Sequence, residues 1–296
     1  MKINHDTLSV LIVNWNTRDL LAKCLESLSL EAKNVFDKLS IETQIIVVDN
    51  NSADGSLQMV SDLFKDVTLI ANSQNYGFAY ANNQAYAVAT GFYILMLNPD
   101  TIVLENSIIT LIEFLQGHKG VGIVAPQLLN TDLTIQKSCR SFPTIQAMFY
   151  ELLGLSKINQ AKFGQYKMLD FNHDCVRSVD QPEGACLLTT RDVIDKCGFL
   201  DNNFFMLFEE VDWCYRVKQA GYDIWFEPGA KIIHHYGQAI KQVKSKMIFH
   251  SHKGFYLFWK KHYRQNNFWL DPFVYVGLYI LAMLRVVQYK IKSVLG

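Results

Sequence analysis

Three carboxylates lie within four residues in the segment Glu209-Glu210-Val211-Asp212, between the apolar stretches FFMLF and WCYR. Adjacent acids in apolar surroundings raise one another's pKa, which favours a proton-accepting role. The structural alternative is the acidic first turn of a helix, which the helix dipole stabilises. On a helix, Glu209 and Asp212 share a face, whereas Glu210 points about a quarter turn away. One acid can therefore serve chemistry while another anchors Arg216 or a substrate hydroxyl.

Asp100 is the strongest candidate for a cation ligand. It follows the apolar run Phe92 to Leu97 in the sequence Asn98-Pro99-Asp100. Magnesium commonly takes only one or two protein carboxylates together with phosphate oxygens, so a lone carboxylate at a sheet edge can bind it. The structural alternative is an Asp-Thr turn or a helix N-cap. The pair His234-His235 ends another apolar run; such pairs are more often structural, but a strand-end imidazole can complete the coordination of a cation at Asp100.

Polar residues also follow three earlier apolar runs, as Asn14-Trp15-Asn16, Asp49-Asn50-Asn51-Ser52, and Asn72 to Asn75 before Gly77. Open α/β sheets bind ligands at the carboxyl ends of their strands, so these segments predict a shared ligand site. A turn followed by a capped helix is the alternative for Asp49. The chain has no GxGxxG and no GxxxxGK[ST] motif, which disfavours a Rossmann dinucleotide site and a P-loop.

A sheet must bring these segments together. Short β-branched runs alternate with helical patterns in the first half of the chain, which is typical of βαβ units around a mostly parallel sheet. The runs are almost continuously apolar, as in strands covered on both faces. Helical spacing of Leu20, Leu21, Cys24, Leu25 and Leu28 predicts a helix that Thr17 is placed to cap. The expected strands are Leu8 to Val13, Gln44 to Val48, Val67 to Ala71, Phe92 to Leu97 and Val121 to Ala125.

The pattern loosens between Gln127 and Gln181, where we expect a mobile, partly helical connection over one face of the sheet. Regular structure is expected again afterwards. The predicted elements are a strand at Ala185 to Leu188, a helix near Asp192 to Cys197, a helix from about Glu209 to Ala220, and strands at Asp223 to Phe226 and Lys231 to His234.

The last part of the chain is different in kind. Residues 246–264 mix basic and aromatic side chains and predict a basic aromatic helix. In the segment that follows, the longest uncharged run, Pro272 to Leu284, is shorter than the ~20 residues that span a bilayer. The two interpretations are a core-packed terminal helix and an interfacial helix in the headgroup region of an anionic leaflet. An aromatic and basic frame favours the interfacial helix: Trp269, Tyr275, Tyr279, Arg285, Lys290 and Lys292.

Composition excludes several classes of protein. Half of the 296 residues are hydrophobic and 19% are charged, so the chain can form a sizeable core and is not mainly disordered. Its 28 basic and 28 acidic residues give no net charge and no global field for nucleic acid. The six cysteines show no CxxC pair or zinc spacing and indicate reduced core thiols. The first apolar run, Leu8 to Val13, is too short for a secretory signal, so we expect a cytoplasmic protein.

Six blocks in this order resemble the family 2 glycosyltransferases with the GT-A fold, particularly the bacterial rhamnosyltransferase-like branch that builds surface polysaccharide. The blocks are SVLIVNWN, IIVVDNNSADGS, NSQNYGFAYANNQA, ILMLNPDT, EGACLLTTRDVIDKCGFLDNNFFMLFEEVDWCYRVKQAGY and IIHHYG. They cover roughly four-fifths of the chain. The resemblance implies an α/β GT-A domain over residues 1–240, with a nucleotide-sugar half (1–126) and an acceptor half (127–240), and a C-terminal helical, membrane-interfacial segment (241–296).

The resemblance also implies roles for individual residues. Asn98-Pro99-Asp100 stands where the family has its DxD motif, so Asp100 is the expected ligand of Mg²⁺ or Mn²⁺; Asn98 replaces the first carboxylate. His234, with His235 as a substitute, matches a histidine that joins the metal. Glu210 matches the usual general base, with Asp212 in reserve. The expected nucleotide-sugar contacts are Val13, Asn14, Trp15, Asp49, Asn51, Asn75, Gly77, Phe78, Asn82, Asn83, Asn98 and Gly184, with Ala185 and Cys186 beside them.

The implied reaction is an inverting single displacement at the anomeric carbon of a dTDP- or UDP-sugar, with rhamnose as one candidate sugar. The implied acceptor is a saccharide or a polyprenyl-linked saccharide, and the implied location is the inner face of the cell membrane. Two rival functions remain. One is a non-catalytic subunit that binds nucleotide-sugar or membrane, which the acids at Asp100 and Glu210 disfavour. The other is a sugar-phosphate nucleotidyltransferase, which is disfavoured because VNWNTRD lacks an early glycine-rich loop.

Overall fold

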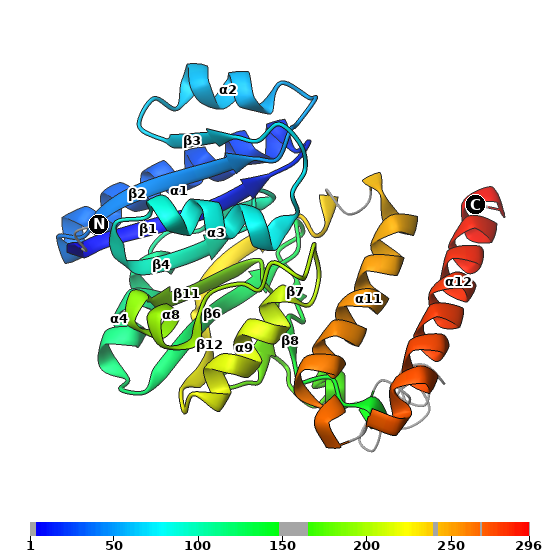
Figure 1. The fold of residues 1–296 in the computed structure, drawn as a ribbon. Helices are drawn as coiled ribbons and strands as arrows, with labels where there is room; N and C mark the ends of the chain where they lie inside the picture. Colours follow the sequence, from blue (N-terminus) through cyan, green and yellow to red (C-terminus); the bar gives the residue numbers. More distant parts are fainter. Residues whose placement is uncertain (1–3, 148–164, 239–241, 267, 296) are drawn as a thin grey trace.

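The computed structural model describes residues 4–147, 165–238, 242–266 and 268–295. Its centre is a mixed sheet with the strand order β3-β2-β1-β4-β11-β6-β12-β5 (Figure 1). These strands are β1 (Asn4–Asn14), β2 (Glu42–Asp49), β3 (Thr68–Ala71), β4 (Gly91–Leu97), β5 (Thr101–Val103), β6 (Val121–Leu129), β11 (Cys186–Thr190) and β12 (Asp223–His234). Four neighbouring pairs are parallel, whereas β11 runs antiparallel to both β4 and β6 and β5 runs antiparallel to β12.

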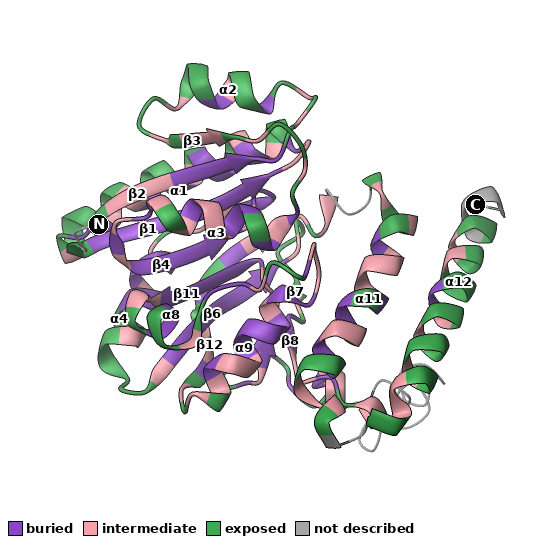
Figure 2. Cartoon of the chain, viewed as in Figure 1, coloured by how far each residue is buried: buried purple, intermediate pink, exposed green. Residues whose placement is uncertain are grey.

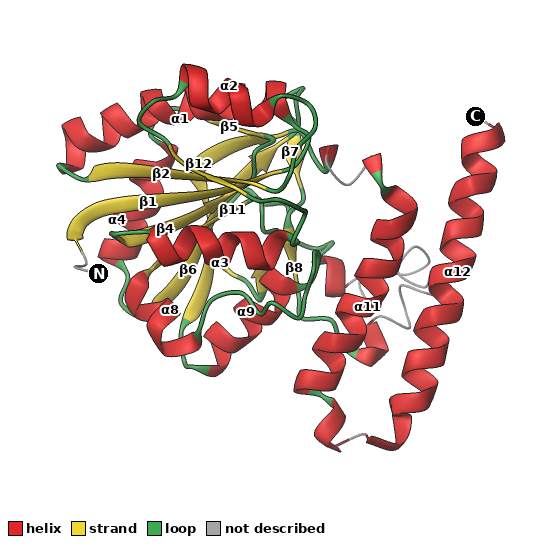
Figure 3. Ribbon diagram, turned by 45° about the horizontal axis from the view of Figure 1, so that its top comes forward, coloured by secondary structure: helices red, strands yellow, loops and turns green. Residues whose placement is uncertain are grey.

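Helices cover both faces of the sheet (Figure 3). The helices of the main domain are α1 (Arg18–Leu39), α2 (Ser56–Leu63), α3 (Phe78–Val88), α4 (Ser107–Gly117), α8 (Arg191–Cys197) and α9 (Glu209–Gln219). Side chains alternate along β1: Val10 and Ile12 pack in the core with α1 and α4, whereas Leu11 and Val13 pack in the core with α3, α8 and α9. Burial on both faces explains why the strands are almost continuously apolar.

Parallel pairing brings the polar segments to one edge. In register, Asn14 pairs with Asp49, and Ile12 pairs with Leu97, the residue before Asn98. β11 is antiparallel to both β4 and β6, so β6 and β12 run in the same direction as β4. The last residue of β12, His234, therefore lies at this same edge, where it pairs with Thr101 next to Asp100.

The predicted strands and helices are present, with the following corrections. The two strands expected at 223–226 and 231–234 are one strand, β12, with a shift of register between Glu227 and Lys231. β5 was not predicted, because three residues carry too little periodicity. Thr17 stands at the N-cap of α1, but its hydroxyl donates to Asn14 Oδ1 rather than to the helix. All six cysteines are free as expected, although Cys175 is exposed and Cys197 half-buried.

The connection expected over residues 127–181 is partly helical in its described residues, as predicted, and it also contains short strands that were not predicted. Residues 145–147 are helical, and residues 148–164 lie outside the described chain. The short elements are β7 (Ile135–Gln136), β8 (Cys139–Arg140), η1 (Gln165–Lys167), β9 (Arg177–Ser178) and β10 (Gln181–Pro182). β7 extends the main sheet beside β6 and β9 extends it beside β12, so this connection is partly sheet.

The C-terminal part is a helical hairpin of α11 (Lys244–His262) and α12 (Asp271–Leu295), joined through η2 (Arg264–Asn266) and η3 (Phe268–Leu270). α11 packs Phe255 and Phe258 against Phe208 and Val211 of the main domain. α12 lies beside α11 and is largely exposed (Figure 2). This exposure contradicts the core-packed alternative. By length and composition, the 24-residue segment Phe268–Ile291 is also long and apolar enough to cross a membrane, which its uncharged run alone did not suggest.

Candidate active site

A cavity of about 530 Å³ opens at the carboxyl ends of the strands. Residues from the sheet edge, from the segment before α9, and from the start of α11 line it together. Of the residues predicted from sequence, the cavity is lined by Val13, Trp15, Asn75, Phe78, Asn98, Asp100, Gly184, Ala185, Glu210 and His234. The other predicted residues lie behind this lining or beside it, and their contacts show what they do.

Asn14 and Asp49 lock the ends of β1 and β2 together. Asn14 Nδ2 donates to Asp49 Oδ1 at 2.9 Å and to Ser52 Oγ at 3.1 Å. The amide of Ser52 donates to Asp49 Oδ2 at 2.9 Å. Both predicted residues are buried and neither lines the cavity. They hold the loops that present Val13 and Trp15, because the short polar side chains satisfy the backbone where the strands end.

The segment before α3 is tied to the segment before α9. Gly77 has φ +93°, and a Cβ there would lie 2.5 Å from the carbonyl oxygen of Phe205, so only glycine fits. The amide of Phe78 donates to that same oxygen at 2.7 Å. Asn75 lines the cavity and accepts a hydrogen bond from the amide of Gly77. The close contact of Gly77 and Phe78 with Phe205 therefore joins the segment before α3 to the segment before α9, and both segments line the cavity.

Three asparagines near this segment lie elsewhere than expected. Asn51 is exposed, and its neighbour Asn50 lines the cavity instead. Asn82 is buried and donates to the carbonyl of Phe78 within α3. Asn83 donates to the carbonyl of Leu200 and to Asn202, which again links α3 to the loop before α9. Cys186 is likewise a core residue of β11.

Asp100 and His234 face one another where β12 ends. Their facing atoms, Asp100 Oδ1 and His234 Nε2, are 3.4 Å apart, and both residues are buried. Burial by itself raises the pKa of Asp100, but the neighbouring His234 and a hydrogen bond from the backbone amide of Gln238 bring the pKa below its ordinary value of 3.8. The carboxylate is therefore ionised at neutral pH. His235 contributes its backbone amide to the carbonyl of Asp100, not its ring.

The donor atoms at this point fit a divalent cation. His234 Nδ1 lies 2.8 Å from Gln136 Oε1, an oxygen that only accepts, so Nδ1 donates a hydrogen bond there and Nε2 is the ring atom that faces Asp100. Nε2 and the Oδ1 of Asn98 are buried without a hydrogen-bond partner in the described chain. The described residues contain no group of three or more His, Cys, Asp and Glu side chains that holds a metal alone. Phosphate oxygens and water have to complete such a site.

Glu210 lies at the start of α9 and lines the cavity opposite this edge. Burial, together with the charge of Glu183, raises its pKa from 4.5 to about 7. Glu209 also lines the cavity, and burial and the charge of Glu210 raise its pKa well above the ordinary value. The acidic residues thus form the first turn of helix α9, and two of them, Glu209 and Glu210, also have raised pKa values. The structural and the chemical interpretation of this segment therefore both hold.

Gly184 leaves room for Glu210. A Cβ at position 184 would lie 3.2 Å from Cγ and 3.3 Å from Cβ of Glu210, closer than ordinary contact. We expect Gly184→Ala to push the Glu210 carboxylate aside and to lower roughly tenfold or more the rate of any reaction that depends on this carboxylate, because misplacement of a reacting group by about 1 Å can cost 10²-fold. Steady-state kinetics and a melting curve check this. Turnover equal to that of the wild type would show that Glu210 tolerates the contact.

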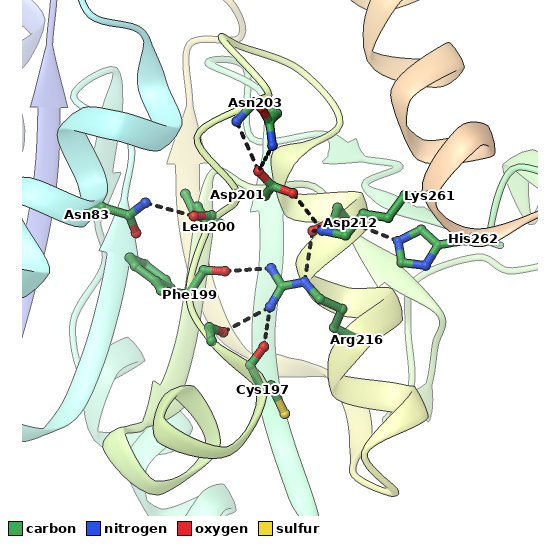
Figure 4. A network of polar contacts seen from close by, with 11 residues as sticks. Asn83, Cys197, Phe199, Leu200, Asp201, Asn203, Asp212, Arg216, Lys261 and His262 are labelled. Atoms are coloured by element: carbon green, nitrogen blue, oxygen red, sulfur yellow. Dashed lines mark hydrogen bonds and ion pairs between the residues drawn. The ribbon is translucent and has the colours of Figure 1, made fainter.

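Asp212 does not line the cavity but lies at the centre of an ionic cluster (Figure 4). Arg216 Nε contacts its Oδ2 at 2.8 Å, and His262 Nε2 contacts its Oδ1 at 2.8 Å. Lys261 Nζ lies 2.9 Å from Oδ1 and also binds Asp201 at 2.7 Å. Burial alone raises the pKa of Asp212, but the hydrogen bond from His262 and the charges of the two other cations lower it to about 2.

This cluster connects three elements. Arg216 belongs to α9, and its guanidinium also donates to the carbonyls of Cys197, Gly198 and Phe199 after α8. Lys261 and His262 belong to α11. Asp212 therefore fixes α9 between α8 and the C-terminal hairpin. A carboxylate bound by Arg216, Lys261 and the ring of His262, with a pKa of about 2, is a poor proton acceptor, so the geometry does not support Asp212 as the reserve base.

Sequence reasoning assigned no role to several lining residues. Glu183 is half-buried, its partial desolvation raises its pKa, and it interacts electrostatically with Glu210, Asp100 and His234. Its only sequence signal was its place beside Gly184. Phe205, Met206 and Leu207 line the cavity from the loop before α9, and Lys244 and Lys246 line it from α11. In the sequence these two lysines are simply part of a basic helix. They line the cavity only because α11 packs against the main domain.

The fold and this site agree with comparisons to known proteins. The family described as Glycosyl transferase family 2 matches residues 9–169, more than half of the chain. A rhamnosyltransferase of Mycobacterium tuberculosis that acts on N-acetylglucosaminyl-diphospho-decaprenol is 24% identical over 279 residues, covering 90% of this chain and 88% of its own. Rhamnosyltransferase WbbL of Escherichia coli K12 is 25% identical over 235 residues, covering 76% and 82%.

A third relative, the low-salt glycan biosynthesis hexosyltransferase Agl10 of Haloferax volcanii, is 25% identical over 224 residues; the match covers 74% of this chain and 64% of that protein. Among solved structures, the mannosyltransferase PcManGT of Pyrobaculum calidifontis, in complex with GDP-Man and Mn²⁺, superposes with a TM-score of 0.59 over 98% of this chain and 75% of its own, at 14% identity. At that identity the likeness shows the fold alone. The chain thus has a GT-A fold and belongs to glycosyl transferase family 2, as a rhamnosyltransferase-like member.

Proposed function

We propose that this protein transfers a sugar from a nucleoside-diphosphate donor to a saccharide acceptor with inversion at the anomeric carbon. One observation carries the proposal: an ionised carboxylate at the sheet edge, Asp100, and a carboxyl group of raised pKa on a helix, Glu210, line the same cavity. The first suits a cation with phosphate oxygens, and the second suits transfer of a proton near neutral pH.

The donor nucleotide is assigned to the loops after β1, β2 and β3. Val13, Trp15, Asn50 and Asn75 line this part of the cavity, and Asn14, Asp49 and Gly77 hold them in place. Asp100 and His234 would hold Mg²⁺ or Mn²⁺ together with the diphosphate, and the buried Oδ1 of Asn98 is a further acceptor. The ion would supply charge stabilisation for the departing nucleoside diphosphate.

The chain's own residues then act on the acceptor. Glu210, ionised above pH 7, accepts the proton of the acceptor hydroxyl as the oxygen attacks the anomeric carbon. Gly184 lets its side chain reach this position. Glu183 contributes negative charge that keeps the pKa of Glu210 high, which makes Glu210 a stronger base. The rigid sheet edge and α9 hold donor and acceptor in line, which lowers the entropic cost of the encounter.

Donor and acceptor classes are proposed from the relatives. A dTDP-sugar such as dTDP-rhamnose is the first donor to test, with UDP-sugars second, because two relatives are rhamnosyltransferases. A polyprenyl-linked saccharide is the proposed acceptor, because one relative acts on a diphospho-decaprenol saccharide. The exposed apolar α12 supports peripheral contact with the inner face of the cell membrane, in surface polysaccharide synthesis. We also propose that the GT-A domain comprises residues 1–240 and that residues 241–296 form a separate C-terminal segment.

The experiment is a thermal-shift panel of nucleoside diphosphates and their sugars with and without Mn²⁺, because a ligand that binds the folded state raises the melting temperature. We expect the matching nucleotide to stabilise the wild type most strongly with Mn²⁺. Asp100→Asn should remove the Mn²⁺-dependent part of the shift and leave a smaller shift without metal. Asp132→Asn, on an exposed turn, is the matched control. Equal shifts in Asp100→Asn and wild type would contradict the metal site, and release of pyrophosphate during turnover would favour a nucleotidyltransferase.

A further inference from the structure

One face of α11 carries two lysines and a histidine that have no acidic partner among the described residues. Lys246, His250 and Lys253 recur at helical spacing, so they lie on one side of the helix, which we call the basic face. α11 contains no acidic residue, and in the described part of the chain no ion pair involves Lys246 or Lys253. By contrast, Lys261, two turns further along, is paired with Asp201 and Asp212.

The basic face begins at the active-site cavity. Lys246 lines the large cavity, and His250 and Lys253 line a second, small hollow directly beside it. Phe205, Met206 and Leu207 line both, so the two spaces are contiguous along one loop. The ring of His250 stacks on Phe205 with 4.8 Å between centroids, and Lys246 Nζ lies 5.8 Å from the same ring.

The hollow depends on close approach of α11 to this loop. A Cβ at Gly254 would lie 2.7 Å from the carbonyl oxygen of Leu207, so only glycine lets the helix come so near. Holding Lys246, His250 and Lys253 together is electrostatically unfavourable: burial and the two lysine charges lower the pKa of His250. A bound anion removes this repulsion, and the two exposed lysines, which have no acidic partner among the described residues, are available to it.

α12 lies along another side of α11 with its apolar residues exposed. Tyr279 contacts Phe249, and Tyr275 contacts Tyr256, which fixes the two helices side by side. Phe273, Val276, Ile280 and Leu284 are each more than half exposed: 72%, 53%, 54% and 56%. A ligand bound along the basic face of α11 therefore has two lysines in reach and the apolar helix α12 on the neighbouring side of α11.

We propose that the basic face of α11, formed by Lys246, His250 and Lys253, binds the diphosphate of a polyprenyl-diphosphate-linked acceptor, with the prenyl chain directed toward α12. This rests on the proposed glycosyl transfer and names the part of the same site that takes the acceptor. The donor diphosphate has its own position at Asp100 and His234, where no lysine is needed if a divalent cation is present. The cations of the basic face are thus left for a second diphosphate.

The probe is geranyl diphosphate, a short prenyl diphosphate, titrated into the full chain in EDTA so that metal-assisted binding at Asp100 does not contribute. We expect binding that is weakened about tenfold or more in the double variant Lys246→Gln with Lys253→Gln, since each lysine contributes a charge-assisted contact. Lys260→Gln, an exposed lysine of the same helix beyond the hollow, is the matched control and should bind like the wild type. Melting curves establish that the variants are folded, as expected for exposed positions.

Parallel arms identify the source of the phosphate. Geraniol should not bind measurably, inorganic pyrophosphate should bind more weakly than geranyl diphosphate, and nucleoside diphosphate with Mn²⁺ should stabilise the double variant as it does the wild type. Affinity for geranyl diphosphate that is unchanged in the double variant, or equally reduced in Lys260→Gln, overturns the proposal. The proposal is also overturned if the basic face binds vesicles of anionic phospholipid but not geranyl diphosphate. Loss of nucleotide binding in the double variant would assign Lys246 to the donor, whereas failure of the wild type to bind any nucleotide would reject the proposed function itself.

Discussion

Glu210→Gln will lower kcat by about 10²- to 10⁴-fold and leave binding of the nucleoside diphosphate unchanged. The amide fills the same space against Gly184 but cannot accept the proton of the acceptor hydroxyl. Single-turnover assays of transfer, with thermal shifts for nucleotide binding, separate the two effects. Full turnover by this variant would remove the base role from Glu210.

The pH dependence of the wild type provides an independent check. Because the pKa of Glu210 is raised to about 7, the carboxyl group is protonated and inactive as a base below that pH. We therefore expect kcat to rise with pH through about 7 and to level off above it. A pH profile whose acidic limb lies near the ordinary value of 4.5 would be inconsistent with a buried base.

Glu210 also makes folding depend on pH. Its ordinary pKa of 4.5 applies to the unfolded chain, and the raised value applies to the folded chain. Between these values the folded chain holds the proton more tightly, so the contribution of this group to stability is present below pH 4.5 and is lost as the pH rises through about 7. Relative to the wild type, Glu210→Gln should therefore gain free energy of unfolding between pH 5 and 8, which denaturant titrations at the two pH values measure. A stability difference that does not vary with pH would show that burial does not perturb this group.

Asp212→Asn will lower the free energy of unfolding by about 3 kcal/mol, the largest effect on stability that we expect from one polar substitution. The change leaves Arg216, Lys261 and His262 facing a neutral amide in a buried position. The loss stays at the lower end of the range for a broken buried ion pair, because Lys261 is about a third exposed and keeps Asp201. Denaturant titration at pH 7 measures it.

Asp201→Asn is the matched control, because Asp201 binds the same Lys261 from a more exposed position, and we expect it to cost under about 1 kcal/mol. A loss below about 1 kcal/mol in Asp212→Asn as well would contradict a structural role for the cluster. Well below its melting temperature, Asp212→Asn should keep turnover within about tenfold of the wild type, whereas Glu210→Gln should not. Abolished turnover in a folded Asp212→Asn protein would return the base role to Asp212. Lowering the pH from 3.8 toward 2 should remove the same stabilisation, since the folded carboxylate is protonated only near pH 2.

The polar edge of the sheet could be predicted from the sequence because it depends on local sequence patterns. Apolar runs of strand length, helical spacing and turn residues lie within short windows, and they predicted five strands. Asn14 and Asp49 end two of these strands, and Asp100 lies in the turn after a third. Parallel pairing then places the ends of such strands together without further information, as the register of Asn14 with Asp49 shows. The resemblance to family 2 glycosyltransferases added an expected role for each position, and the family and the fold are confirmed.

Tertiary packing decided what the individual polar side chains do, since their partners lie far along the chain. Asp212 meets Lys261 and His262 across 49 and 50 residues, and no local pattern around the acidic triplet contains that information. Its neighbour Glu210 faces the cavity only because α9 begins where Gly184 leaves space.

The sequence by itself determined that the chain forms a covered α/β sheet with polar strand ends, because hydrophobic periodicity is a property of consecutive residues. It also determined a basic helix followed by an apolar one at the C-terminus. Only the tertiary structure decided that α12 is exposed and that Lys246 reaches the cavity. It also decided that Asp212 is bound by Arg216 and Lys261, whereas Glu210 has no ion pair with a described residue. Burial and charge pairing depend on which surfaces meet, and that is set by the packing of elements distant in sequence.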